Sequence, residues 1–599
     1  MRWALSLAWA LLAAAGAGSA VVAAPAERVQ VSSLPEWPVQ FTRRANYTAT
    51  AEVVDLEGTL AVAYSATSNN LHLLGNRALN LPGWPAEINA SYPPCLADID
   101  GDGEVEIFSA GALPGGAQHY FGFRLDGSPL PGWPVVVTTL PFISVSAMCT
   151  IADLDGDGTL EIIGGSRLGE VSVWDQDGEL LDGWPVVLPV GVDLPNVPGS
   201  AVADLDGDGT LEVILTPASG FVHVLRHDGT GFPGFPVNLE APIGRNPALA
   251  DVDGDGQLEI IIATRGGRGT PRKRLFVLRT DGTFQPGFPV IVGDQVFSSV
   301  AIADLDRDGE LWIVASVSSP SETIMVWNAR TGQPRPGFPV FNAGIDQVFA
   351  SPTVGDITGD GFPEILLTRS FVGFAPAMLL AWDRFGVPVE PFPLRVFQGF
   401  QVFIAASALT DLNDDGLIDI LPAEGNRLHA LTTHMPYDPR TMEWPTESHD
   451  VRHTGVYSPP VDELRLHGRF VSDFVFLDRS PARLTARVKF VDRRRDLAAT
   501  LARGGVRLAA INDRPVDGIE GHILAYPGVG GMGASVEQSD FIVQFDGRAV
   551  AAAILQRLRR AGVSGGEERS VRLKLESPLQ DRRRVGGELR LQVRMPVGG

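Results

Sequence analysis

A motif of alternating aspartates recurs at intervals of roughly fifty residues along the first three quarters of this chain. Its clearest copy reads "IADLDGDGTLEII" at residues 151–163, and related stretches begin at residues 96, 202, 249, 302, 354 and 409. A degenerate copy that lacks the aspartate loop, "VVDLEGTLAVAY", begins at residue 53. Repetition at such a period is typical of architectures in which each repeat is one supersecondary unit packed on its neighbours. It constrains the fold more than any other feature of the sequence.

A second motif, an aromatic residue followed by proline, alternates with the aspartate stretches. It reads "LPGWPV" at residue 130 and "FPGFPV" at residue 232, with further copies at 81, 181, 285, 335, 389 and 442 and a leading copy, "LPEWPV", at 34. Apolar and polar residues alternate on both sides of the aspartates, which favours strands over helices. Strands average about five or six residues, so each repeat has room for four strands and their turns.

An array of four-stranded units of this length predicts an all-β protein built on a β-propeller. An open solenoid would need polar caps at both ends, and the sequence contains no such cap. Eight units favour eight blades, while seven remain open if the first unit only completes the closure. The leading "LPEWPV" is expected to add a strand to the last blade. The aromatic residues are expected to pack between blades; the alternative, a platform for stacking sugars, requires exposed rings.

The aspartate stretches have the spacing of cation-binding loops. In "IADLDGDGTLEII" the side-chain oxygens fall at positions 1, 3, 5 and 9, which are Asp153, Asp155, Asp157 and Glu161, and Thr159 offers its carbonyl at position 7. A flexible loop with about six hard oxygen donors suits calcium, whereas zinc prefers histidine and cysteine. An EF-hand places its last carboxylate at position 12 between helices. Strands flank these loops instead, so a hairpin-type calcium loop is predicted.

The predicted ligands recur in seven loops that are not equally complete. The full set is Asp98, Asp100, Asp102, Glu106; Asp153, Asp155, Asp157, Glu161; Asp204, Asp206, Asp208, Glu212; and Asp251, Asp253, Asp255, Glu259. The weaker copies are Asp304, Asp306, Asp308 with Trp312 at position 9; Asp356, Thr358, Asp360, Glu364; and Asp411, Asn413, Asp415, Asp419. A hundredfold excess of calcium over its dissociation constant adds about 2.7 kcal/mol per site. Several sites together predict a structural role for calcium; solvated acidic turns without an ion are the alternative.

On these motifs the chain resembles the FG-GAP/VCBS repeat proteins, whose blades also build the integrin α-chain propeller. The resemblance covers residues 30–457 and rests on the D-x-D-x-D-G-x-x-E loops, with the bacterial VCBS subgroup as the closer likeness. It implies a secreted, calcium-loaded propeller used in cell adhesion or ligand binding. "WPTESHDVRHTGVY", from residue 444, is similar to the segment that ends such arrays. Its His449 and His453 suggest either a metal site or hydrogen bonding within a closing turn.

The N-terminus and the cysteines bear on the compartment. Residues 1–24 combine Arg2, a short apolar run and a small-residue exit, which predicts a signal peptide and a protein that is secreted, to the cell surface or to the periplasm. The apolar run is too short to span a bilayer. Cys95 and Cys149 precede neighbouring aspartate loops; a disulfide and two buried thiols both remain open. A net charge of −23 argues against nucleic acid and anionic membranes as partners.

A second domain is expected after the repeats. Residues 458–463 form a Pro-rich linker, and residues 464–599 alternate as strands with one helical stretch, "RAVAAAILQRLRRAG". This pattern predicts a small immunoglobulin-like β-sandwich. "GVSGG", around Ser564, matches a nucleophile elbow only formally, because a helix precedes it and a strand follows.

These features favour a binding or adhesion protein over an enzyme. The partner expected is an extracellular protein or glycan, and the segments 111–120, 264–273 and 369–378 are the candidate binding loops. The alternative is a polysaccharide lyase or glycosidase, which requires a base or a matched carboxylate pair, but nearly all acidic clusters belong to the predicted calcium loops. A quinone-cofactor dehydrogenase ranks third, because no redox residues are identifiable.

Overall fold

The computed structural model describes most of residues 28–457 and the strands that follow residue 464. The described ranges are 28–41, 51–56, 59–66, 70–88, 90, 93–102, 104–112, 118–138, 149–166, 169–189, 199–265, 273–292, 296–317, 323–340, 350–369, 378–395, 406–424, 427–450, 452–457, 465–470, 474–476, 483–491, 506–511, 514–515, 520–525, 540–546, 550, 552–554, 556, 568–578 and 584–594. The predicted signal peptide, the linker 458–463 and Ser564 lie outside them. The predicted domain boundaries therefore stay predictions.

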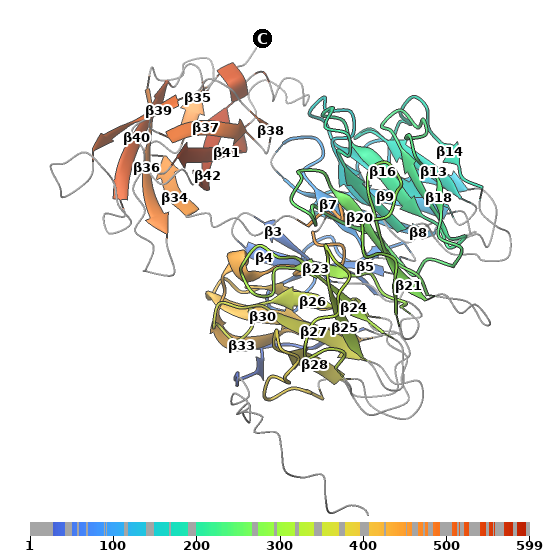
Figure 1. The fold of residues 1–599 in the computed structure, drawn as a ribbon. Helices are drawn as coiled ribbons and strands as arrows, with labels where there is room; N and C mark the ends of the chain where they lie inside the picture. Colours follow the sequence, from blue (N-terminus) through green and yellow to red (C-terminus); the bar gives the residue numbers. More distant parts are fainter. Residues whose placement is uncertain are drawn as a thin grey trace, which may run out of the picture.

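The described strands of residues 28–457 form eight antiparallel blades, as the sequence favoured (Figure 1). Blades 1 to 4 are β3 (Glu52–Leu56), β4 (Thr59–Ala66), β5 (Asn70–Gly75), β6 (Ala86–Glu87); β7 (Cys95–Ala97), β8 (Glu106–Ala112), β9 (Gln118–Phe123), β10 (Val135–Thr138); β11 (Thr150–Ala152), β12 (Glu161–Gly165), β13 (Glu170–Trp174), β14 (Val186–Val187); and β15 (Gly199–Ala203), β16 (Glu212–Thr216), β17 (Phe221–Leu225), β18 (Val237–Asn238).

Blades 5 to 7 are β19 (Ala248–Ala250), β20 (Glu259–Ala263), β21 (Arg274–Leu278), β22 (Val290–Ile291); β23 (Ala301–Ala303), β24 (Trp312–Ser316), β25 (Ile324–Asn328); and β26 (Thr353–Gly355), β27 (Glu364–Arg369), β28 (Met378–Trp382). In blades 6 and 7 an isolated bridge, at Val340 and Leu394 respectively, takes the place of the fourth strand. Blade 1 has no aspartate loop, because β3 and β4 pair as a hairpin directly from Leu56 to Thr59.

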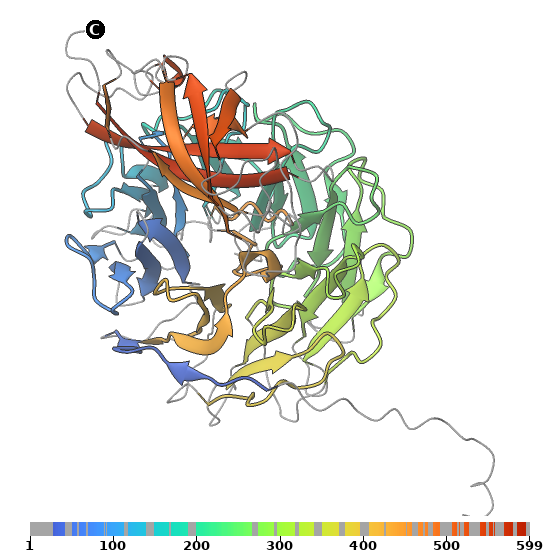
Figure 2. The same cartoon turned by 90° about the vertical axis from the view of Figure 1, so that its left-hand side faces the viewer.

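The eighth blade joins the two ends of the repeat region. It contains β29 (Ala408–Thr410), β30 (Leu417–Leu421), β31 (Ala423–Glu424), β32 (Arg427–Leu428) and β33 (Leu431–Pro436), together with the N-terminal strands β1 (Ser32–Ser33) and β2 (Val39–Gln40). β1 pairs with β33 and β2 with β32, so the leading "LPEWPV" completes the last blade as predicted. Figure 2 shows the blue N-terminal strands beside this blade. The innermost strands contact one another all round the ring, from β3 through β29 and back to β3.

The hydrophobic core lies between blades rather than within them. One cluster combines Phe108 and Trp133 of blade 2 with Ile151 and Trp174 of blade 3, all buried. The next combines Val173 of blade 3 with residues of blade 4 in the same way. Each blade is a thin sheet that buries its two faces only against its neighbours. This is why the repeat needs a complete ring to form a core.

The aromatic–proline motif forms a corner that contacts the following blade. The corner rings of Trp37, Trp84, Trp133 and Trp184 are buried, and each indole N–H donates to a backbone carbonyl of the next blade at 2.8–3.1 Å. Packing between blades is therefore confirmed over a sugar-stacking platform. The copy at residue 442 was misassigned: Trp444 lies in the central channel, where it pairs with Val354 of blade 7.

Glycine is required before the aromatic residue of the corner. Gly183 has φ of 92°, and a Cβ there would lie 2.0 Å from the carbonyl oxygen of Asp228 in the next blade. The same close approach recurs at Gly83, Gly132, Gly234, Gly287 and Gly337. The corner thus sets the distance between adjacent blades.

Gly183→Ala is expected to lower the free energy of unfolding by about 1–3 kcal/mol or more, because it combines a left-handed conformation with a steric clash. Gly231→Ala is the control, since a Cβ at Gly231 meets no atom within 4 Å. Urea or thermal unfolding of both variants measures the effect. Equal stability of the two variants would contradict the role assigned to the corner.

A disulfide joins blades 2 and 3 at their innermost strands. Cys95 begins β7, Cys149 precedes β11, and the two sulfur atoms are bonded at 2.03 Å. Of the two alternatives left open by the sequence, the structure contains the bonded pair. The bridge adds a covalent link between the innermost strands, where each blade otherwise meets its neighbour through noncovalent contacts.

The strands after residue 464 form one sheet whose ends meet. They are β34 (Arg465–Phe470), β35 (Phe474–Phe476), β36 (Arg483–Val491), β37 (Val506–Ile511), β38 (Arg514–Pro515), β39 (Glu520–Ala525), β40 (Asp540–Asp546), β41 (Glu568–Pro578) and β42 (Arg584–Arg594). Because β34 pairs with both β36 and β42, the immunoglobulin-like sandwich is not confirmed. Residues 550, 552–554 and 556 are helical, within the predicted helical stretch. Within the described ranges, no helix combines the length and apolar character that crossing a membrane requires.

Candidate functional site

The seven aspartate loops connect the first and second strands of blades 2 to 8. Because strands in a blade are antiparallel and the repeat is regular, all seven loops lie on one face of the propeller, here named the Asp-loop face. The connections between second and third strands, and those between blades, lie on the opposite face, here named the long-loop face. The two faces therefore carry different classes of loop.

Hydrogen bonds to backbone N–H groups shape each loop. In the loop of blade 4, Asp204 accepts from Gly209 at 3.0 Å, and Glu212 accepts from Leu205 at 2.8 Å through Oε2. Gly207 and Gly209 adopt φ of 78° and 91°, which glycine tolerates best. The equivalent bond from the closing carboxylate recurs for Glu106, Glu161, Glu259, Glu364 and Asp419. One carboxylate oxygen thus holds the loop, and the second oxygen of Glu212 and of Asp419 accepts no hydrogen bond from a described residue.

The structure brings most of the predicted ligands into compact groups. Within each group the candidate ligand atoms lie within 4.8 Å of one another, and the groups are Asp98, Asp100, Glu106; Asp153, Asp155, Glu161; Asp204, Asp206, Glu212; Asp251, Asp253, Asp255; and Asp356, Asp360, Glu364. Among the described residues, Glu259 and the position-5 residues Asp102, Asp157 and Asp208 lie outside these groups. The loops at 304 and 411 supply no such group of acidic residues.

Burial makes these carboxylates hard to ionise without a nearby cation. It raises the pKa of Glu106 to about 10, and the charge of Asp100 adds to the increase. It likewise raises the pKa of Glu161 to about 8 and that of Glu212 to about 7. Close negative charges in a partly desolvated loop favour protonation or a bound cation. The loops are therefore electrostatically incomplete by themselves.

Unused oxygen atoms indicate what would complete the loops. Asp153 Oδ1, Glu212 Oε1, Asp253 Oδ1 and Asp419 Oδ1 are buried and accept no hydrogen bond from any described residue. A buried acceptor without a partner costs free energy, which a coordinated cation would recover. An all-oxygen donor set on a glycine-rich loop fits calcium. The residues present thus fit the ion that the sequence predicts, and the individual ligands remain predictions.

The loop of blade 8 is a weaker candidate. Asn413 Nδ2 donates to Asp415 at 3.0 Å, so an amide lies where the complete loops have a second carboxylate. Asp419 still holds the backbone of Leu412, and burial raises its pKa to about 7. This loop keeps the fold of the others with a smaller negative charge.

The loop of blade 6 departs furthest from the pattern. Both oxygens of Asp306 accept from the guanidinium of Arg335 at 2.7 and 2.8 Å, and these bonds lower the pKa of Asp306. The spacing of the aspartates gives no indication of Arg335. The signal was present, because "RPGFPV" is the one described corner that begins with a cation, in the one repeat that has Trp312 for the closing carboxylate.

Glu212→Gln is expected to remove one bound calcium ion per chain. The amide oxygen can still accept from Leu205, but the loop loses one negative charge and gains a buried amide N–H₂ group. The stabilisation by calcium should fall by at most about 2.7 kcal/mol, and only when calcium is present.

Metal content after dialysis and melting with and without chelator provide the measurement. Glu179→Gln, at an exposed turn outside the loops, is the control. An unchanged metal content in the Glu212 variant would refute the assignment of this carboxylate.

The long-loop face carries the segments that the sequence singled out for binding. Segments 111–120, 264–273 and 369–378 connect β8 to β9, β20 to β21 and β27 to β28. Their central parts, 113–117, 266–272 and 370–377, lie outside the described residues. The described strand ends that flank all three segments emerge on the long-loop face.

A closing segment, residues 438–457, fills the channel at the centre of the ring. It begins with a short 3-10 helix, η1 (Pro439–Thr441). It then hydrogen-bonds to seven of the eight blades, at Glu52, Ile151, Val202, Leu249, Asp304, Val354 and Leu409. Five of these blades, at Ile151, Val202, Leu249, Val354 and Leu409, donate a backbone N–H of the innermost strand to a closing-segment carbonyl at 2.8–3.1 Å. The segment thus satisfies strand edges that would otherwise face an open channel.

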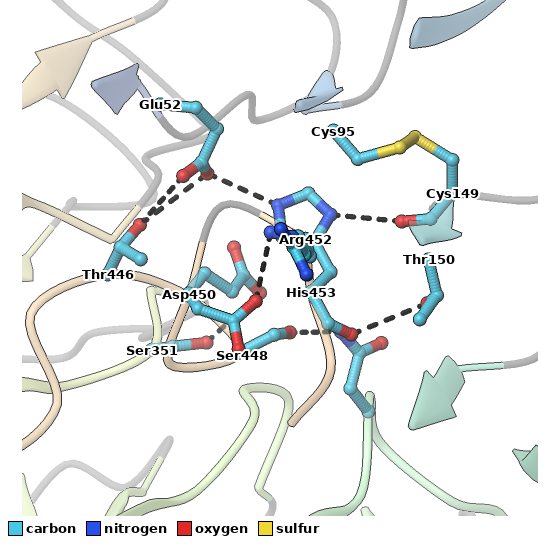
Figure 3. Close-up of polar contacts among 12 residues, drawn as sticks. Glu52, Cys95, Cys149, Thr150, Ser351, Thr446, Ser448, Asp450, Arg452 and His453 are labelled. Atoms are coloured by element: carbon cyan, nitrogen blue, oxygen red, sulfur yellow. Dashed lines mark hydrogen bonds and ion pairs between the residues drawn. A yellow bond between two sulfur atoms is a disulfide. The ribbon is translucent and has the colours of Figure 1, made fainter. Parts of the chain in front are cut away.

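His453 is the centre of this closure (Figure 3). Its Nε2 lies 3.3 Å from Glu52 at the start of blade 1, and its Nδ1 lies 3.1 Å from the carbonyl oxygen of Cys149 before blade 3. Both side chains are fully buried, and Thr446 also donates to Glu52. Both ring nitrogens of His453 are therefore engaged in hydrogen bonds, which supports the closing-turn alternative over a metal site for His453.

The buried His453–Glu52 pair makes the closure sensitive to pH. Burial raises the pKa of Glu52, and the hydrogen bond to His453 opposes this increase. Burial also acts to lower the pKa of His453, but the hydrogen bond and charge of Glu52, with the charge of Asp450, outweigh it and raise the pKa. Both shifts mean that the folded state binds protons more tightly than the unfolded state.

His453→Gln is expected to destabilise the propeller more at pH 6 than at pH 9. The raised pKa of His453 contributes stability that is complete below pH 6.5 and is lost as pH rises through the folded-state pKa. The loss at pH 6 should be about 1–3 kcal/mol, the range for a buried group that loses a partner.

Thermal unfolding at both pH values, with His434→Gln at an exposed site as the control, provides the measurement. If the stability difference between wild type and His453→Gln is the same at pH 6 and pH 9, the charged pair is refuted.

Known families agree with this geometry. Residues 153–215, 204–262 and 251–315 match the FG-GAP-like repeat. The chain contains FG-GAP-like repeats. Each match runs from one aspartate loop to the strand after the next loop, so it spans the contact between two blades. The predicted resemblance to FG-GAP repeats is thereby confirmed for residues 153–315. No curated protein matches the chain.

Solved structures share the fold at low sequence identity. The V. cholerae biofilm matrix protein Bap1 is 13% identical with a TM-score of 0.50, covering 72% of this chain and 97% of Bap1. Sqt1 of Saccharomyces cerevisiae is 12% identical with a TM-score of 0.43, covering 69% of this chain and 100% of Sqt1. The quinohemoprotein alcohol dehydrogenase of Comamonas testosteroni is 12% identical with a TM-score of 0.41, covering 68% and 78%. Bap1 supports the propeller fold; the other two likenesses are too low to carry an argument.

Proposed function

We propose that this protein is a secreted, calcium-stabilised propeller that binds an extracellular protein or glycan on its long-loop face. The observation that carries this proposal is the separation of the two faces. The Asp-loop face is occupied by seven regular turns whose carboxylates serve the fold. The long-loop face instead carries connections that differ in length and sequence from blade to blade, as binding surfaces on rigid scaffolds do.

Calcium is proposed as the structural cation of the aspartate loops. The compact carboxylate groups, the unused buried oxygens and the FG-GAP-like repeats support it together. The compartment fits as well, since residues 1–24 predict a signal peptide and the Cys95–Cys149 disulfide suits an oxidising environment.

A glycan is the first ligand class to test. Bap1, which shares the fold, is a biofilm matrix protein, and such matrices contain polysaccharide. The propeller surface is acidic overall, so a neutral or cationic glycan is favoured over a polyanion, which the net charge of −23 would repel.

The test is binding of the secreted protein to a glycan array and to immobilised extracellular matrix. Replacing residues 266–272 with a two-residue turn should abolish or weaken binding, because the ends of β20 and β21 that flank this segment emerge on the long-loop face. Leu180→Ser, at an exposed turn on the Asp-loop face, should leave binding unchanged. Chelator should reduce binding only as far as it unfolds the propeller.

Two outcomes would contradict the proposal. Equal loss of binding in both variants would remove the assignment of the face. Turnover of a polysaccharide by the purified protein would replace the binding function with the alternative, a lyase or glycosidase.

A further inference from the structure

The loop of blade 6, residues 304–312, differs from the complete aspartate loops at three points. Trp312 stands in place of the closing glutamate, and Arg307 stands where those loops have glycine. Arg335 begins the aromatic–proline corner of the same blade, where the other blade corners begin with an uncharged residue. Two cations and an aromatic ring thus replace a carboxylate and two neutral residues in one repeat.

All three guanidinium nitrogens of Arg335 donate hydrogen bonds. Its two terminal nitrogens donate to both oxygens of Asp306 at 2.7 and 2.8 Å. Its Nε donates to the carbonyl oxygen of Arg384 in blade 7 at 2.8 Å, in the role that the corner indole plays in the tryptophan-containing blades. The group lies 4.3 Å from the ring of Trp312, and the side chain is only 5% exposed.

Both carboxylate oxygens of Asp306 therefore accept hydrogen bonds from a cation of the protein itself. The contrast is blade 5, where Gln285 occupies the corner position of Arg335. Gln285 donates to one oxygen of Asp253, and the other oxygen of Asp253 is buried without a hydrogen-bond partner among the described residues. An uncharged corner residue leaves an oxygen for a metal, whereas arginine takes both.

Arg307 ties the same loop to the closing segment. Its guanidinium lies 2.7 Å from the buried carboxylate of Glu443 and donates to the carbonyl oxygen of Arg440 at 3.1 Å. Glu443 also accepts from the backbone of Asp304 at 3.2 Å and from the hydroxyl of Tyr457 at 2.5 Å. Arg307 has φ of 59°, the same left-handed conformation that glycine adopts at the equivalent position of the complete loops, for example 78° at Gly207. The loop thus contacts the channel as well as the next blade.

We propose that residues 304–312 form a metal-independent staple in which Arg335 and Arg307 replace the cation. Trp312 closes the loop by stacking on Arg335, where a carboxylate would otherwise complete a metal site. Blade 6 and its contacts with blade 7 and the closing segment then stay ordered when calcium is withdrawn. This goes beyond the proposed binding function and uses the calcium assignment only for its control.

The first test compares the position-3 residues of two loops, in the full-length secreted protein. Asp306→Asn should leave the calcium content unchanged and should lower the melting temperature equally with and without chelator. Asp155→Asn, in a complete loop, should lose one calcium ion and lower the melting temperature only when calcium is present. Metal analysis after dialysis and thermal melts measure both.

Three results would overturn the staple. They are loss of a calcium ion in Asp306→Asn, a shift in melting temperature confined to calcium, or no shift at all. If Asp155→Asn also keeps its metal content, the calcium proposal for the complete loops fails, while the chelator-independent shift of Asp306→Asn still decides the staple.

A second test reverses the substitution. The double variant Trp312→Glu with Arg335→Leu restores the carboxylate and the neutral corner of the complete loops, and it should bind one additional calcium ion. Its stability should then depend on calcium more strongly than that of wild type. A folded double variant with unchanged calcium content would show that the two residues do not determine metal binding. If the double variant fails to fold, the Asp306→Asn comparison decides alone.

Discussion

The structure depends on closing the ring of blades. Each blade is a thin sheet with an apolar face on either side, and its innermost strand presents a hydrogen-bonding edge to the channel. The faces are buried only if every blade has two neighbours, and the edges are satisfied only if something enters the channel. β1 and β2 meet the first demand by joining the N-terminus to the last blade, and the closing segment meets the second. A break at either place would expose apolar surface and backbone polar groups together.

The aspartate loops and the closing segment balance their buried charges in different ways. The complete aspartate loops concentrate negative charge that burial makes costly, and the cation proposed for them would offset this cost. The closing segment instead uses internal charge, with His453 beside Glu52 and Arg307 beside Glu443. Removing one partner of a buried ion pair strongly destabilises a protein, because the other charge is left buried without compensation. The channel is therefore the part of the propeller that we expect to tolerate substitution least. The outer loops are the part most responsive to the surrounding medium.

Much of this fold is readable from the sequence, for identifiable reasons. The repeat period, the strand alternation and the corner motif are local and recur many times. A copy that departs from the pattern can therefore still be recognised by comparison with the others. The failures concern features that occur once. The motif at residue 442 resembles a corner but lies in the channel, because the same tryptophan–proline pair can pack in either place. Glu52 gives no signal, since its partner His453 is 401 residues away in the chain. The sandwich predicted after residue 464 is not among these failures and stays a prediction, because strand alternation alone does not determine how strands pair.

The candidate metal sites show the same division between pattern and exception. Oxygen spacing in the complete loops predicts groups of ligands that the structure largely assembles, because short loops between paired strands have few conformations. Blade 6 shows what spacing alone does not reveal: its Asp304, Asp306 and Asp308 follow the pattern, yet Arg335, which donates to both oxygens of Asp306, lies 29 positions after it. A cation-binding loop is defined as much by what surrounds its carboxylates as by the carboxylates themselves. In a repeat protein, the residues beside the predicted ligands should therefore be compared between blades as carefully as the ligands themselves. An arginine in place of a neutral residue can supply the positive charge that a metal ion would otherwise bring.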